Sequence, residues 1–103
     1  RRIHGGAYAP EAMFKAGDVE VMGETISFTL KSTPRISCAK CGARLYADVA
    51  AANLKGVNGT LLDDFTPAFH MHCSEAVLPV RDDLPHFAKQ PAAFGGDDAL
   101  VDW

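Results

Sequence analysis

Apolar and polar residues alternate most clearly in the stretch TISFTLK, from Thr25 to Lys31. Ile26, Phe28 and Leu30 take every second position, which is the period of a strand with one buried face. The pattern therefore predicts a strand over this stretch. The strand is expected to end at the following Ser-Thr-Pro, because proline has no amide to give to a ladder.

Shorter segments predict further strands. They cover residues 12–16, 19–22, 43–49 and 68–80. Turns are expected at Gly17-Asp18, Gly23-Glu24 and Asn58-Gly59, because glycine and asparagine accept the backbone conformations that turns need. Helical patterns are confined to a turn or two within 9–16 and 47–54. The chain is therefore predicted to be mainly β, as one domain over residues 1–103.

The composition changes after Val80, where proline, glycine and aspartate become frequent. This predicts an irregular C-terminal tail over residues 81–103, with one turn of helix near Leu84–Ala88. Phe87, Phe94 and Trp103 are spaced along the tail. These aromatic side chains are suited to hold the tail against the body of the protein or against another subunit.

The charge and the cysteine content of the sequence argue against several classes of partner and indicate a cellular compartment. Ten basic and thirteen acidic residues give a formal net charge of −3. No basic run exceeds Arg1-Arg2, which argues against nucleic acid as a partner. No apolar run approaches the roughly 20 residues that a membrane helix needs, so no membrane partner is expected. Three cysteines are too few, and an odd number, for a disulfide scaffold, which favours a reducing compartment such as the cytoplasm.

The motif ISCAKCG contains the most specific chemistry of the chain. Cys38 and Cys41 are separated by two residues and followed by Gly42. Such a loop between two extended segments is typical of a zinc knuckle, in which amides of a tight turn point at the two sulfurs. A thiol-redox pair is an alternative, but it needs a helix after the motif, and Gly42 is a poor start for one. Two ordinary buried cysteines, or an adventitious disulfide, are the third interpretation.

A structural zinc site has four ligands, and the knuckle supplies two. The remaining candidates are Cys73, His70, His72, His4 and His86. If 68–80 is a strand, His70 and His72 share one face and Cys73 points to the other, so all three cannot reach one metal. Taken singly, each of the three is expected to be an ordinary strand residue, and His4 and His86 carry no specific expectation. The zinc site therefore looks incomplete within this chain.

Four landmarks occur in order: RISCAKCGARLY, GTLLDD, PAFHMH and VRDDLPHF. Together they resemble the C-terminal two thirds of the glutathione-dependent formaldehyde-activating enzymes, the Gfa-like family that includes centromere protein V. The positions that match the family pattern are Cys38, Cys41, Gly42, Gly59, Thr60, Leu61, Asp63, Pro67, His70, Leu84, Pro85 and Phe87.

The resemblance implies two packed antiparallel sheets of the β-tent type, as in methionine sulfoxide reductase B and translationally controlled tumour protein. It also implies a structural zinc held by Cys38 and Cys41 together with an upstream Cys-x-Cys. A second, catalytic zinc would be held by three cysteines of a central cluster, with an open position for a thiol such as glutathione. The implied reaction class is a carbon–sulfur lyase that forms S-hydroxymethylglutathione from formaldehyde.

The upstream Cys-x-Cys and the central cluster are absent from this sequence, which begins RRIHGG. The domain is therefore expected to be N-terminally incomplete, or a shortened homologue, and inactive as it stands. No catalytic residue is assigned, and Cys38 and Cys41 are the predicted ligands of a structural zinc. The alternative function is a non-catalytic binding module of the same fold. In either case the missing strands would leave an edge and an apolar face bare, so a homo-oligomer is expected.

Overall fold

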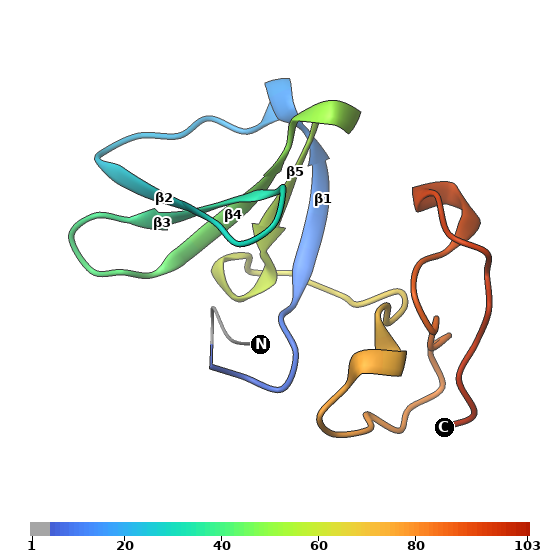
Figure 1. The fold of residues 1–103 in the computed structure, drawn as a ribbon. Helices are drawn as coiled ribbons and strands as arrows, with labels where there is room; N and C mark the ends of the chain where they lie inside the picture. The colour runs from blue at the N-terminus through green and yellow to red at the C-terminus, as the bar shows by residue number, and fades with distance from the viewer. Residues whose placement is uncertain (1–4) are drawn as a thin grey trace. The chain divides into compact units, whose positions relative to one another are not determined.

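The computed structural model describes residues 5–103, which form two compact units. One unit, Ala9–Phe65, contains the sheet shown in Figure 1. The other unit consists of Thr66–Trp103 together with residues 5–8. Within residues 5–103, no helix has both the length and the apolar character needed to cross a membrane.

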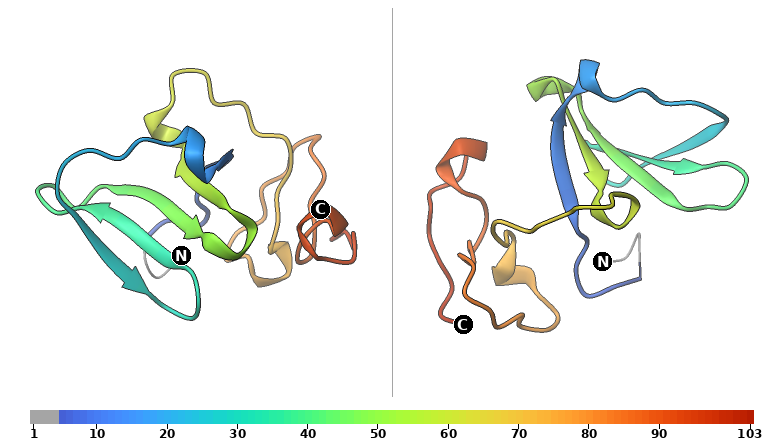
Figure 2. Two further views of the ribbon diagram at one scale, coloured as in Figure 1. Left: turned by 90° about the horizontal axis from the view of Figure 1, so that it is seen from above. Right: turned by 180° about the vertical axis from the view of Figure 1, so that it is seen from behind.

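The sheet is open, antiparallel and five-stranded, with strand order β1-β5-β4-β3-β2. Its strands are β1 Glu11–Lys15, β2 Thr25–Thr29, β3 Pro34–Cys38, β4 Arg44–Val49 and β5 Leu54–Asn58. Strands β2 to β5 follow one another as a meander, and β1 adds to the free side of β5, so β1 and β2 form the two edges (Figure 2). The prediction of a mainly β, antiparallel fold is confirmed. A second sheet, expected from the family resemblance, is not found among residues 5–103.

Each face of the sheet carries one continuous row of cross-strand neighbours, because paired residues point to the same side. The first row is Ala12, Val57, Tyr46, Ile36 and Ser27. The second row is Met13, Gly56, Ala47, Arg35 and Phe28. Ile36 and Ala47 are the buried apolar residues of this unit, and they lie on opposite faces of the sheet, so neither face carries a large core.

Several predicted strands are confirmed. The pattern over 12–16 gives β1, that over 25–31 gives β2, and that over 43–49 gives β4. The prediction of a strand over 19–22 is wrong, because these residues pair with no strand and form the long connection from β1 to β2. Pro34 not only follows β2 but also begins β3, a position where the missing amide costs no ladder bond.

Short 3-10 helices occupy most of the turns in the sheet unit. They are η1 Ala16–Asp18, η2 Ala50–Ala52 and η3 Gly59–Leu61. The expected turns at Gly17-Asp18 and Asn58-Gly59 therefore exist. In the second turn the Asn58 side chain accepts hydrogen bonds from the Thr60 amide at 3.1 Å and the Thr60 hydroxyl at 2.9 Å. The same side chain donates to the Arg44 carbonyl at 3.0 Å, which ties the end of β5 to β4.

The second unit, by contrast, has no extended ladder. Two isolated bridges join its segments, a parallel one between His70 and His86 and an antiparallel one between Phe87 and Leu100. The predicted strand over 68–80 is wrong, because His72 adopts a left-handed conformation (φ 58°) and the chain then enters the 3-10 helix η4, Cys73–Glu75. The predicted helical turn at Leu84–Ala88 is also wrong, because both bridges run through this segment.

Aromatic packing replaces a sheet as the interior of this unit. The Phe69 ring lies 5.6 Å from the Phe87 ring, edge to face, and 5.8 Å from the Phe94 ring, measured between centroids. Phe94 ends the 3-10 helix η5, Ala92–Phe94. Two of the three tail aromatics therefore join one cluster, in which edge-to-face contacts add to the burial of apolar area.

Candidate metal centre

His70 and His86 are brought together by their backbones. The His70 amide donates to the Pro85 carbonyl at 2.8 Å, and the Phe87 amide donates to the His70 carbonyl at 2.9 Å. These two bonds clamp His70 alongside His86 in a parallel bridge. As a result the two imidazole rings stack, with centroids 4.7 Å apart and planes 7° from parallel.

Asp82 comes from the loop before His86. One carboxylate oxygen, Oδ1, accepts a hydrogen bond from the Leu84 amide at 3.0 Å, which is an Asx turn. The other oxygen, Oδ2, lies 2.8 Å from Nε2 of His70. Nε2 of His86 lies 3.3 Å from Oδ1 of the same carboxylate. One carboxylate therefore faces both rings.

The three side chains differ in their contact with solvent. His86 is buried at 5% exposure, His70 keeps 20% and Asp82 keeps 37%. Nε2 of His86 also lies 2.6 Å from the Val80 carbonyl, and the Trp103 ring covers His86 at 5.2 Å between centroids. The cluster is therefore enclosed on the His86 side and open to water on the Asp82 side.

The surroundings hold the pKa of Asp82 below its ordinary value. The hydrogen bond from His70 is the main cause, followed by a smaller opposing effect of desolvation, and the Leu84 amide then adds to the lowering. A carboxylate kept ionised next to two imidazole nitrogens is a good acceptor for either protons or a cation.

This donor set fits a transition-metal ion. The ligand atoms of His70, Asp82 and His86 all lie within 4.8 Å of one another. Two imidazole nitrogens with one carboxylate oxygen are ligands that zinc, ferrous iron and related divalent ions accept. A bound ion would replace the hydrogen bonds that Nε2 of each histidine makes with Asp82 and Val80, and the two stacked rings would have to turn toward the ion.

The predicted knuckle residues form a tight hairpin in the other unit. Cys38 ends β3, its amide donates to the Ala43 carbonyl at 2.9 Å, and the Gly42 amide donates back to the Cys38 carbonyl at 2.9 Å. Gly42 takes a left-handed conformation (φ 75°), as the sequence predicted. Hydrogen bonds from the amides of Cys41 and Lys40, and then from the Cys41 thiol, lower the pKa of Cys38.

No third ligand joins this pair among residues 5–103, where His70, Asp82 and His86 make up the one group of three potential ligands. Cys38, Cys41 and Cys73 are all free thiols. Cys73 is buried in η4, and burial raises its pKa. His72 is exposed and outside the cluster, and His4 lies outside the described residues. Whether Cys38 and Cys41 bind zinc remains a prediction.

The sequence reasoning did not single out two of the three cluster residues. The Asp82 carboxylate accepts a hydrogen bond in a turn, and the sequence analysis assigned no ligand role to Asp82 or His86. Their four-residue separation was the available signal, because the carboxylate and imidazole at i and i+4 here come within 3.3 Å. His70 was predicted to be an ordinary residue of a strand over 68–80 that places it on one face with His72, and this strand is not formed.

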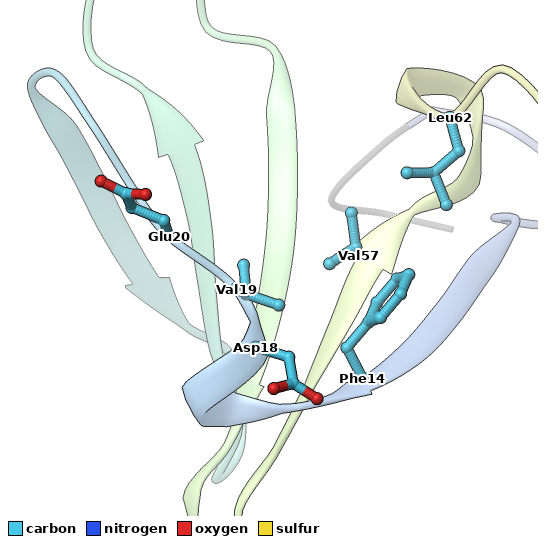
Figure 3. A pocket seen from close by; sticks show the side chains of 6 residues that line it. All are labelled: Phe14, Asp18, Val19, Glu20, Val57 and Leu62. Carbon is cyan, nitrogen blue, oxygen red and sulfur yellow. The ribbon is translucent and has the colours of Figure 1, made fainter.

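The sheet unit also has a shallow hollow of about 250 Å³, shown in Figure 3. Its lining residues are Phe14, Asp18, Val19, Glu20, Val57 and Leu62. The side chains of Phe14, Val19, Val57 and Leu62 converge on it, whereas the Glu20 carboxylate points away (Figure 3). The hollow is an apolar surface without a reactive group at its centre, so it is a weaker candidate than the His–Asp–His cluster.

No family model matches this sequence, and no curated protein or solved structure shows significant similarity to it.

Proposed function

We propose that this protein binds one divalent transition-metal ion, zinc in the first instance, through His70, Asp82 and His86. The observation that supports the proposal is the convergence of the three ligand atoms to within 4.8 Å. Two further structural features support the proposal. A histidine at 5% exposure is held with its ring nitrogen toward a carboxylate, and a backbone bridge fixes the second histidine against it.

The proposed ion would keep at least one position for an external ligand. Zinc is normally four-coordinate, and three protein ligands with one open position are typical of catalytic rather than structural sites. The open side would be that of Asp82 and His70, which keep 37% and 20% of their surface exposed. A bound ion would supply Lewis-acid activation of a water or substrate oxygen at this position, and the buried ring of His86 would hold the ion in place.

Cobalt(II) titration tests the proposal, because its spectrum reports the ligand type. Binding through two imidazoles and a carboxylate gives visible d–d bands without the near-ultraviolet sulfur charge-transfer band that thiolate ligands produce. His70→Asn should abolish the visible bands, and His72→Asn, which removes an exposed histidine two residues away and suits its left-handed backbone, should not. A spectrum dominated by sulfur charge transfer would overturn the assignment.

The Gfa-like interpretation is a second candidate, favoured by one observation. The hairpin of Cys38 and Cys41 joins two strands and directs amides at the Cys38 sulfur, as a zinc knuckle requires. In this proposal the chain belongs to a β-tent carbon–sulfur lyase, with Cys38 and Cys41 on a structural zinc and glutathione as the thiol partner. The alternative within it is a non-catalytic module of the same fold, completed by self-association into a homo-oligomer.

The two proposals differ in the residues that would bind the metal ion. Because the catalytic cysteine cluster of the family is absent from this sequence, the chain itself should not accelerate the formation of S-hydroxymethylglutathione from formaldehyde and glutathione. The Gfa-like proposal is tested instead through its structural zinc. Cys38→Ser should lower the zinc content of the purified protein, and an unchanged zinc content would contradict the proposal. We also propose a reducing, cytoplasmic location, which the small and odd number of cysteines in the sequence supports.

A further inference from the structure

Arg35 and Arg44 lie on the same face of the sheet, whereas regular alternation along β3 and β4 would place them on opposite faces. Tyr46 pairs with Ile36, and Ala47 pairs with Arg35. By simple alternation Arg44 would share the face of Tyr46, opposite Arg35. The register shifts between Ile36 and Ser37, so that Ser37 pairs with Arg44 and Leu45 becomes an extra residue.

This shift is a β-bulge, and bulges commonly redirect a side chain next to a functional site. Ser37 lies two residues after Arg35 in β3 and therefore on the same face. Its partner Arg44 is turned to that face by the bulge. Two guanidinium groups and a hydroxyl are thus gathered over neighbouring positions of β3 and β4.

Neither guanidinium forms an ion pair with a described carboxylate. Among residues 5–103, no carboxylate oxygen lies within 4.0 Å of Arg35 or Arg44. Nε of Arg44 is buried and makes no hydrogen bond. The Ser37 hydroxyl likewise makes no hydrogen bond to another described side chain or backbone group. A buried N–H without an acceptor is costly, by about 1–3 kcal/mol, and therefore calls for an explanation.

One acidic side chain, that of Glu11, interacts electrostatically with both guanidinium groups. Glu11 in β1 reaches over β5, where a Cβ added at Gly56 would lie 3.1 Å from its Oε2. Desolvation raises the pKa of Glu11, against the opposing effects of Arg35 and Arg44. Desolvation and then repulsion from Arg35 lower the pKa of Arg44, with Glu11 acting in the opposite sense. Two guanidinium groups therefore interact with one carboxylate whose pKa is raised by burial.

We propose that Arg35, Ser37 and Arg44 form a binding site for an oxyanion carried on an apolar organic body, either a phosphate monoester or a carboxylate. Guanidinium forks match the paired oxygens of both groups, and a hydroxyl completes the donor set. The apolar part of the ligand has a surface to lie on. Phe28 pairs with Arg35 and Ile26 pairs with Ser37, and these side chains are 59% and 58% exposed.

Isothermal titration calorimetry of the full chain with phenyl phosphate, and separately with benzoate, tests this proposal and distinguishes phosphoryl from carboxylate ligands. Chloride at equal ionic strength is the background. Saturable binding of either probe is expected, together with a loss of affinity of about tenfold or more in Arg44→Met, because the charge-assisted hydrogen bonds of the guanidinium are lost. Lys31→Met is the control, since it removes the same charge from an exposed residue outside the strands and should change affinity less than about twofold.

Arg44→Lys provides a second comparison that keeps the charge but removes Nε and the planar fork. We expect it to fold like the parent, by circular dichroism, and still to lose most of the affinity. Absence of saturable binding for both probes would overturn the site. So would equal binding by the parent and both Arg44 variants, which would show general charge attraction only. None of these outcomes depends on the metal proposal, because the two sites lie in different units.

Discussion

The Nε2 atoms of His70 and His86 face the same carboxylate, at 2.8 Å and 3.3 Å from the two oxygens of Asp82. This relationship follows from one parallel backbone bridge and one Asx turn, both formed by residues that carry no regular secondary structure. A single carboxylate thus joins two segments of the chain. The same three side chains are the ligand set proposed for a metal ion.

Asp82 should contribute to stability in a pH-dependent manner in the metal-free, chelator-treated protein. Its pKa is lowered from 3.8 in the folded state, so its contribution is present above that value and is lost as the pH falls through the folded pKa. Asp82→Asn should be less stable than the parent at neutral pH, and the difference should shrink as the pH drops below 3.8. Urea unfolding followed by Trp103 fluorescence measures this, because Trp103 lies in the same unit.

Asp83→Asn is the matched control for this experiment, because it removes a neighbouring carboxylate outside the cluster. Its stability should parallel that of the parent at each pH. A difference between the parent and Asp82→Asn that stays constant down to the lowest pH would contradict the expected role of the ionised carboxylate.

Cys38 should be alkylated faster than Cys73 by iodoacetamide in metal-free protein. Hydrogen bonds from the Cys41 and Lys40 amides lower the pKa of Cys38, whereas burial raises the pKa of Cys73. The thiolate is the reacting form, so the difference should be largest below the ordinary thiol value of 9.0. Mass spectrometry of quenched samples gives the rates, with urea-unfolded protein as the control in which both thiols react alike. Equal rates in the folded protein would be evidence against the amide arrangement.

Gly59→Ala should destabilise the sheet unit by about 1–3 kcal/mol, as overpacking does. An added Cβ would lie 2.8 Å from Cδ2 of Phe65, and the site is buried. Gly17→Ala is the control, since nothing lies within 4 Å of its added Cβ, and we expect a change within about 0.5 kcal/mol. Urea unfolding followed by far-ultraviolet circular dichroism compares them. Equal stabilities of the two variants would show that Phe65 is not packed against Gly59.

The chain should self-associate through the edge of the sheet. Strand β2 is an edge strand whose residues are all exposed, including Ile26 at 58% and Phe28 at 59%. Unpaired edges with apolar side chains pair readily with a second chain. Phe28→Lys should weaken the association seen by sedimentation velocity at micromolar concentration. Met22→Lys, at an 83% exposed position outside the strands, should not. A parent protein that sediments as a monomer would contradict this prediction.

Local sequence patterns were sufficient to predict some of the strands. In β2 the alternation of Ile26 and Phe28 with polar residues marks a strand without knowledge of its neighbours. Strand β5 was missed because Gly56 and Asn58 are poor strand formers. Gly56 is explained only by its neighbours in β1, since Glu11 and Met13 fill the space above it. The requirement for glycine at position 56 is therefore set by side chains of another strand, β1.

The candidate sites depend even more on contacts between distant residues. The loop of Cys38 and Cys41 is local, and its glycine and turn were predicted correctly. The approach of His70 to His86 depends on a bridge between two irregular segments, which no periodicity reveals. The face of Arg44 depends on a bulge, which reverses the side that alternation assigns to it. The bridge between His70 and His86 and the face occupied by Arg44 could therefore be identified only from the three-dimensional structure.

The zinc content of the parent and two sets of variants tests the central claim most directly. After loading with zinc and dialysis, elemental analysis should find about one ion per chain in the parent. The ion should be retained in the double variant Cys38→Ser, Cys41→Ser and lost in Asp82→Asn and in His70→Asn, since three protein ligands are the fewest that hold such an ion. Zinc that is absent from the parent, or that is lost with the two cysteines and retained without Asp82 and His70, would contradict the assignment of the metal to His70, Asp82 and His86.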